Sequence, residues 1–116
     1  MNKICTSLEQ SKKLIELGID VNTADMYWDY DIQKHEDYPM VMDEQFDDCC
    51  IRAWSLPGLL ELIPEVALSQ NIDKSWDIAS FADDMSFGPV HEIENIDSSI
   101  DAAFEMICWL KENGKI

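Results

Sequence analysis

Residues 95–114, "NIDSSIDAAFEMICWLKENG", constrain the fold more than any other segment of this 116-residue chain. Asp97 or Ser98 supplies an N-cap, and Gly114 follows the last turn. The apolar residues recur at helical spacing and form one stripe, made of Ile100, Ala103, Phe104, Ile107 and Leu110. A helix with one apolar stripe must bury that stripe against other elements, so the chain needs a core around it.

A second helix is predicted over residues 7–17. In "TSLEQSKKLIELG", Thr6 is a candidate N-cap and Glu9, three residues on, completes a capping box. Gly18 then supplies a left-handed stop. The apolar residues Leu8, Leu14, Ile15 and Leu17 lie near one side of this helix.

A short third helix is predicted in "WSLPGLLELIP". Ser55 can cap it, Pro57 falls in its first turn, where a missing amide is tolerated, and Pro64 ends it. Because this helix is apolar on nearly all sides, we expect it to be buried on several of them.

Strand signals occur in two regions. "NTADMYWDY" alternates with period two and predicts a strand near residues 24–30. "SWDIASF" and "SFGPVHEIE" predict two further strands that pair as a hairpin. Between these regions, residues 31–53 show little periodicity and are interpreted as a long loop.

The order of these elements predicts an α+β fold. We expect about a three-stranded antiparallel or mixed sheet, with two long helices and one short helix packed on it. A chain of 116 residues is too short for two ordinary domains, so one domain should span residues 1–116.

The beginning of the chain and its cysteines predict a cytoplasmic protein. "MNKICTSLEQ" lacks the features of a secretory signal, and no stretch approaches the roughly 18 apolar residues of a membrane span. Without export, Cys5, Cys49, Cys50 and Cys108 are expected to be reduced thiols. No membrane association is expected.

The charge of the chain indicates the kind of partner. Twenty-four acidic residues oppose eight basic ones, and the net charge is −16. Between Asp20 and Asp48 there are ten acids, and Lys34 is the only base. Such a field repels phosphate backbones and anionic lipids, so direct nucleic-acid binding is disfavoured, and it attracts a basic protein. The oligomeric state does not follow from the sequence.

The segment "DEQFDDCC" invites a metal interpretation, because Asp43, Glu44, Asp47 and Asp48 are hard oxygen ligands. The segment lacks the spacing and the glycine of an EF-hand loop, and adjacent cysteines do not suit zinc. We interpret it as a hydrated acidic surface with no metal and no cofactor. Two alternatives stay open: a divalent-metal-dependent small enzyme that uses the acidic loop 31–50, and acidity that serves solubility alone.

No catalytic set is predicted, and an enzyme is disfavoured. A nucleophilic site built from Cys49 or Cys50 with His91 and Glu92 has no supporting spacing, and His91 is interpreted as a surface or packing residue. The favoured function is a protein-interaction module for a basic partner, such as an inhibitor or DNA mimic. The candidate partner-binding residues are Asp43, Glu44, Asp47, Asp48, Asp83, Asp84 and Trp109.

Three segments, "ICTSLEQSKKLIELGIDVNTADMYW", "AWSLPGLLELIP" and "DAAFEMICWLKENGKI", resemble a group of small uncharacterised proteins encoded in bacterial prophages and other mobile elements. The chain departs from that group at Arg52 and at Ser98-Ser99, where the group favours Pro and Asn-Pro. The resemblance implies a phage or mobile-element setting, and it implies no cofactor and no site residue.

Overall fold

The computed structural model describes residues 4–31, 36–41, 51–81 and 91–116. Within these ranges the chain forms three α-helices, one short 3₁₀ helix and six β-strands. Their order is α1 (Leu8–Glu16), η1 (Val21–Thr23), β1 (Met26–Asp31), β2 (Glu36–Val41), β3 (Ile51–Ala53), α2 (Leu56–Leu62), β4 (Val66–Gln70), β5 (Trp76–Ser80), β6 (His91–Ile96) and α3 (Ser99–Glu112). The predicted α+β class is confirmed.

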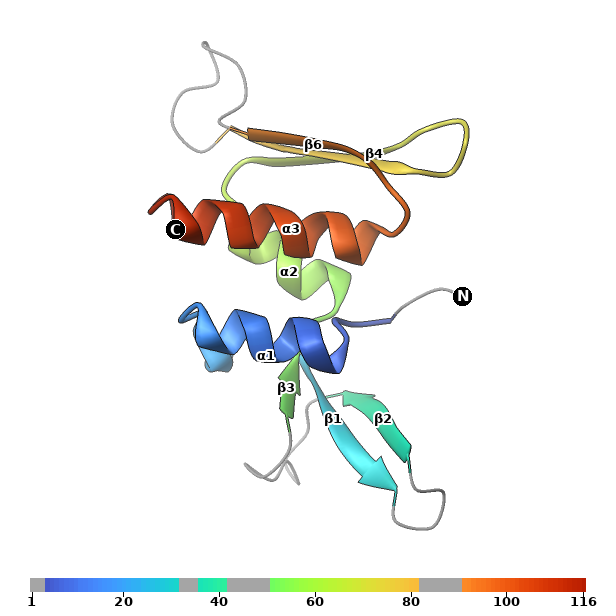
Figure 1. The fold of residues 1–116 in the computed structure, drawn as a ribbon, viewed down its shortest axis with the longest axis vertical. Helices are drawn as coiled ribbons and strands as arrows, with labels where there is room; N and C mark the ends of the chain where they lie inside the picture. Colours follow the sequence, from blue (N-terminus) through green and yellow to red (C-terminus); the bar gives the residue numbers. More distant parts are fainter. Residues whose placement is uncertain (1–3, 32–35, 42–50, 82–90) are drawn as a thin grey trace.

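The strands form two sheets, so the prediction of a single sheet is wrong. Each sheet is antiparallel and three-stranded, with the strand orders β2-β1-β3 and β4-β5-β6. Figure 1 shows the helices as a layer between them, with α1 next to the first sheet and α3 next to the second. Antiparallel strands pair through short connections, so each half of the chain completes its own sheet, and the apolar α2 lies between the halves. Of the two helices expected to be long, α3 has 14 residues and α1 only 9.

The first helix begins one residue later than predicted. Ser7 is its N-cap: the Ser7 hydroxyl accepts from the Gln10 amide at 3.1 Å, and the Gln10 side chain accepts from the Ser7 amide at 2.9 Å. This is a capping box, with Gln10 in the role predicted for Glu9. Thr6 does not cap the helix, because it is fully buried and its hydroxyl lies 2.8 Å from the Ser11 hydroxyl.

The predicted ends of the other two helices are confirmed. Ser55 caps α2, and Pro57 lies in the first turn. Ser98 caps α3 by accepting from the Asp101 amide at 3.4 Å, and Gly114 follows the helix with a φ of 69°. These ends depend on chemistry within a few residues of each other, which is why the sequence predicts them.

The first sheet confirms the strand predicted near residues 24–30 and corrects the long loop predicted over 31–53. β2 pairs with β1 in the register Met26↔Val41, and β3 pairs with the other side of β1. Pro39 interrupts the pattern of β2, but β2 is an edge strand, where a missing amide donor is tolerated. β3 has three residues and is too short to show a period.

The second sheet confirms the predicted pairing of β5 with β6, which run antiparallel. Residues 82–90, which join them, lie outside the described residues. The sequence analysis does not predict β4, which pairs with β5 at the free edge of the sheet. Its outward residues Ala67 and Ser69 are small, so the alternation with Val66 and Leu68 is weak in the sequence.

A β-bulge in β6 changes which side chains reach the core. Trp76 of β5 pairs with Ile96, and Ile78, two residues later, pairs with Ile93, three residues earlier. The extra residue is accommodated by Asn95, which is left-handed with a φ of 60°. Ile93 and Ile96 therefore both pack against the core, although they are not an even number of residues apart.

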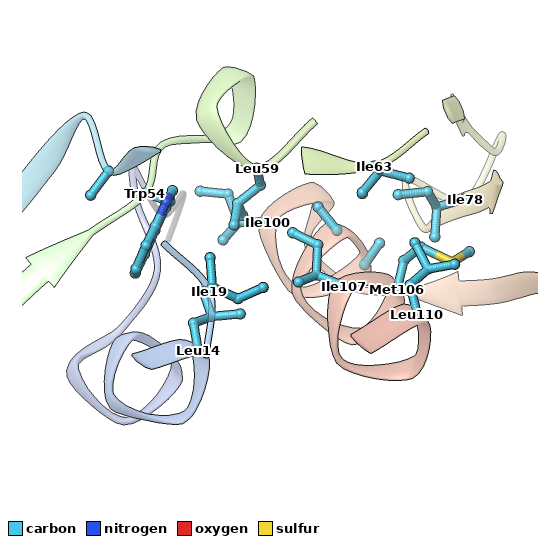
Figure 2. Packing of buried hydrophobic residues seen from close by; sticks show 13 residues of the cluster. Leu14, Ile19, Trp54, Leu59, Ile63, Ile78, Ile100, Met106, Ile107 and Leu110 are labelled. Carbon is cyan, nitrogen blue, oxygen red and sulfur yellow. The ribbon is translucent and has the colours of Figure 1, made fainter. Parts of the chain in front are cut away.

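The main core lies between α3, α2, α1 and the second sheet (Figure 2). A smaller cluster, in which Trp28 packs on Cys5, Met26 and Ala53, attaches the first sheet. The buried residues of the main core are Leu14, Ile19, Ala24, Trp54, Leu59, Ile63, Ile78, Ile100, Ala102, Ala103, Met106, Ile107 and Leu110. The stripe predicted for α3 thus supplies the centre of the core, together with Ala102 and Met106 beside it.

Candidate functional site

Most of the predicted partner-binding residues lie outside the described part of the chain: Asp43, Glu44, Asp47, Asp48, Asp83 and Asp84. The pair Cys49 and Cys50 lies in the same undescribed segments. Of the loop 31–50, on which the metal alternative depends, the structure describes residue 31 and residues 36–41, which belong to β1 and β2. These predictions stay predictions. Trp109 is the predicted residue that the structure describes.

Trp109 lies on α3 at the edge of the main core, where it is partly buried. Its ring stacks on the ring of His91 in β6, with centroids 4.0 Å apart and planes inclined by 2°. The stack joins helix to strand, so of the two roles predicted for His91, surface or packing, the structure shows packing. Trp109 keeps part of its surface exposed, as expected for a residue at the boundary of the core.

A hollow of about 500 Å³ opens where the first turns of α1 and α3 meet the end of β6. We call it the helix hollow. Phe104, which is partly buried against the core, contributes an aromatic wall. The carboxylates that line the hollow are those of Glu9, Asp97, Asp101 and Glu105. Two segments far apart in the sequence thus meet at one acidic surface.

A hydrogen bond positions one side of the helix hollow. The Gln10 side chain donates to Asp101 Oδ1 at 2.7 Å, which ties the first turns of α1 and α3 together. Glu9 and Asp101 lie in those first turns, where a carboxylate interacts favourably with the helix dipole. Glu105 is exposed and lies beyond the first turn, so the helix dipole does not account for it.

A second hollow, of about 210 Å³, lies on the β4-β5-β6 sheet. We call it the sheet hollow. Its floor carries the small residues Ala67, Ser69 and Ala79, and Glu92 and Glu94 line it from β6. In the strand register Ala67 lies opposite Ala79, and Ala79 lies opposite Glu92. Across the three strands, the short side chains of Ala67 and Ala79 are thus followed by the carboxylate of Glu92.

Asp77 also lines the sheet hollow, but its carboxylate is engaged within the sheet. Asp77 Oδ1 accepts from the Asn95 backbone amide at 3.0 Å and from the Asn71 side-chain amide at 2.9 Å. These bonds hold the bulge of β6 and the base of the β4–β5 turn. Glu92 and Glu94 are left as the exposed carboxylates of this surface.

The described residues hold no group of three or more His, Cys, Asp and Glu side chains placed to bind a metal ion. Cys5 and Cys108 are free thiols. Burial raises the pKa of each thiol to about 11, with a further contribution from Asp25 for Cys5 and from Glu112 for Cys108. Both thiols are therefore protonated near neutral pH and are poor nucleophiles there.

Comparison of the chain with protein-family models, with curated proteins and with solved structures finds no match. In the part of the chain that the structure describes, no helix combines the length and the apolar character needed to cross a bilayer. The function is therefore inferred from the surface of the molecule itself.

The sequence analysis predicts neither hollow. The sheet hollow leaves a signal in "HEIEN", where Glu92 and Glu94 alternate with His91 and Ile93, because period two places both carboxylates on one face of a strand. No pattern in the sequence near Glu9 or near residues 97–105 indicates the helix hollow. The hollow joins Glu9 to residues 97–105, and only the packing of α1 beside α3 brings them together.

Proposed function

We propose that this protein is a non-enzymatic interaction module that binds a positively charged protein partner. The observation that carries the proposal is the helix hollow, where four carboxylates from two distant segments, together with Phe104, line one concave surface. The net charge of −16 supports it, because a field of one sign steers an oppositely charged partner toward the surface and accelerates its encounter.

The helix hollow suits a cationic side chain. An arginine can lie against the ring of Phe104 while its guanidinium donates to carboxylates at the rim. The side chains of Glu9 and Glu105 are exposed, so a ligand in the hollow can reach their carboxylates. The hollow is open to solvent, so we expect a moderate affinity that falls with salt.

The proposal extends to the class of partner. We infer a nucleic-acid-binding protein whose basic surface this chain occupies, as a DNA mimic or inhibitor. Such surfaces gather lysines and arginines to neutralise phosphates, and a polyanionic protein presents charge of the same sign as the phosphates. The phage or mobile-element setting that the sequence resemblance implies is part of this proposal. We place the encounter in the cytoplasm, where thiols such as Cys5 and Cys108 stay reduced.

The test is a calorimetric titration of the protein with an arginine-rich peptide. Binding is expected at about 20 mM NaCl and should weaken strongly at about 500 mM, since screening shortens the range of the charges. The double variant Glu9→Gln, Glu105→Gln should bind at least about threefold more weakly, because it removes two charges from the rim of the hollow.

The matched control is the double variant Glu16→Gln, Glu61→Gln, which removes two exposed carboxylates away from both hollows. It should bind nearly as well as the unchanged protein. Equal weakening by the two double variants would mean that the charge acts diffusely and would support the solubility alternative. A protein that shows no salt-sensitive binding would overturn the proposal.

The partner class is then tested by asking whether the protein displaces a labelled duplex from a basic DNA-binding protein.

A further inference from the structure

The β4-β5-β6 sheet has one covered face and one open face. The face toward α3 carries Ile78, which is fully buried, and Leu68 and Ile93, which pack against the core. Successive side chains of a strand point to opposite faces, so the residues that alternate with these three point away from α3. Among the described residues, no helix or strand lies over that outer face (Figure 1).

The outer face of the sheet is made of small and acidic side chains. Ala67 and Ala79 lie opposite each other and Ser69 lies nearby, so the middle of the face has no large side chain. Alanine and glutamate are both depleted in strands, so strand propensity does not account for these residues. The short side chains leave the sheet hollow open, and another chain can approach the sheet backbone closely there.

The charge of this face has one sign. The three strands carry Asp77, Glu92 and Glu94 and contain no lysine or arginine. Glu92 and Glu94 are exposed on one side of the small floor, and the Asp77 carboxylate beside them is held by Asn95 and Asn71. A partner that covers the face must bring positive charge, or it would bury or crowd these carboxylates without compensation.

We propose, resting on the proposed function above, that this outer face is the docking surface for a lysine- or arginine-bearing segment of the basic partner. The aliphatic stems of the basic side chains cover Ala67 and Ala79, and their cationic ends reach Glu92 and Glu94. The short side chains of Ala67 and Ala79 leave space for the aliphatic stems, and the carboxylates of Glu92 and Glu94 attract the cationic ends. Residues of β6 line both hollows, Glu92 and Glu94 in the sheet hollow and Asn95 and Ile96 in the helix hollow.

Two variants separate the fit from the charge. Glu92→Gln with Glu94→Gln removes the charge of the face, and Ala79→Leu fills the sheet hollow without any change of charge. Each should weaken binding of the arginine-rich peptide by at least about fivefold at about 20 mM NaCl. The control is again Glu16→Gln with Glu61→Gln, and thermal unfolding confirms that each variant is folded.

A second measurement locates the peptide on the labelled protein by NMR. Amide shifts in β4, β5 and the outward positions of β6 are expected on titration. If the peptide shifts amides of the helix hollow alone, and the sheet variants bind normally, the docking surface is wrong while the proposed function stands. If the unchanged protein shows no salt-sensitive binding at all, both are wrong. Weakened binding by Glu92→Gln, Glu94→Gln and by Ala79→Leu, together with shifts on the sheet, would support the docking surface.

Discussion

At the scale of single residues, Gly58 and Asp25 are in a contact that leaves no room for a larger side chain. The Asp25 carboxylate accepts from the Ser55 amide at 2.8 Å and also from the Ser55 hydroxyl, which caps α2. A Cβ atom at Gly58 would lie 2.9 Å from Asp25 Oδ1, closer than real Cβ contacts allow. Position 58 therefore needs glycine, because any Cβ atom there would collide with the Asp25 carboxylate.

This contact predicts a reversed effect of helix propensity. In an ordinary helix, replacing glycine by alanine stabilises by roughly 0.5–1 kcal/mol. Gly58→Ala should instead lower the free energy of unfolding by about 1–3 kcal/mol, because Asp25 must move and its hydrogen bonds to Ser55 weaken. Urea unfolding of the purified variant measures the change.

A double-mutant cycle identifies the cause. In an Asp25→Ala background, Gly58→Ala should be neutral or stabilising, since the clashing carboxylate is gone. If Gly58→Ala raised stability in the unchanged background, the close contact would be wrong. If it were equally destabilising in both backgrounds, some other contact of Gly58 would be the cause.

The buried thiols predict a loss of stability at high pH. Burial raises the pKa of Cys5 and of Cys108 from 9.0 to about 11. Below pH 9.0 the thiols are protonated in both states, so their contribution to stability is fully present. Above it the unfolded chain loses these protons first, and stability falls until the pH passes about 11. Urea midpoints measured at rising alkaline pH should fall less steeply in a Cys5→Ala, Cys108→Ala variant, and an unchanged slope would contradict the assignment.

At the scale of elements, the bulge at Asn95 sets the register of β6. It puts Ile93 and Ile96 both against the core, and Asp77 accepts a hydrogen bond from the Asn95 amide at 3.0 Å. The pairing of β5 with β6 could be predicted from alternation, but the extra residue could not, because the alternation itself is what the bulge interrupts.

The bulge predicts opposite responses to two substitutions at one position. Asn95 is left-handed, with a φ of 60°, which asparagine and glycine tolerate and β-branched residues do not. Asn95→Gly should change the free energy of unfolding by less than about 1 kcal/mol, and Asn95→Val should lower it by about 1–3 kcal/mol. Urea unfolding of both variants decides the matter. Equal stability of the two would mean that the left-handed turn is not required.

At the scale of the whole molecule, negative charge is in large excess. The net charge of −16 acts on the folded state as self-repulsion, which salt screens. The melting temperature should therefore rise when NaCl is increased from about 20 mM to about 500 mM. The measurement is differential scanning calorimetry over that range.

Magnesium chloride at matched ionic strength serves as the comparison. We expect magnesium chloride to raise the melting temperature by about as much as NaCl does, because both salts then act only by screening. A much larger stabilisation by magnesium at low concentration would indicate carboxylates that converge on an ion, and it would favour the metal-dependent alternative over an interaction surface.

The sequence by itself determined the α+β class, the three helices with most of their ends, the strands β1, β5 and β6, and the net charge. These features depend on caps, on short periodic patterns or on composition, which act over a few residues or need no structure at all. Even the shift of the first cap from Thr6 to Ser7 was decided by packing, since Thr6 is buried.

The tertiary structure alone decided the division into two sheets, the bulge in β6 and the two acidic hollows. Each of these joins segments far apart in the sequence, as when Gln10 bonds to Asp101 or when Ala67, Ala79 and Glu92 align across three strands. No local pattern encodes such a meeting, because it depends on which faces of the helices and sheets find one another when the core closes.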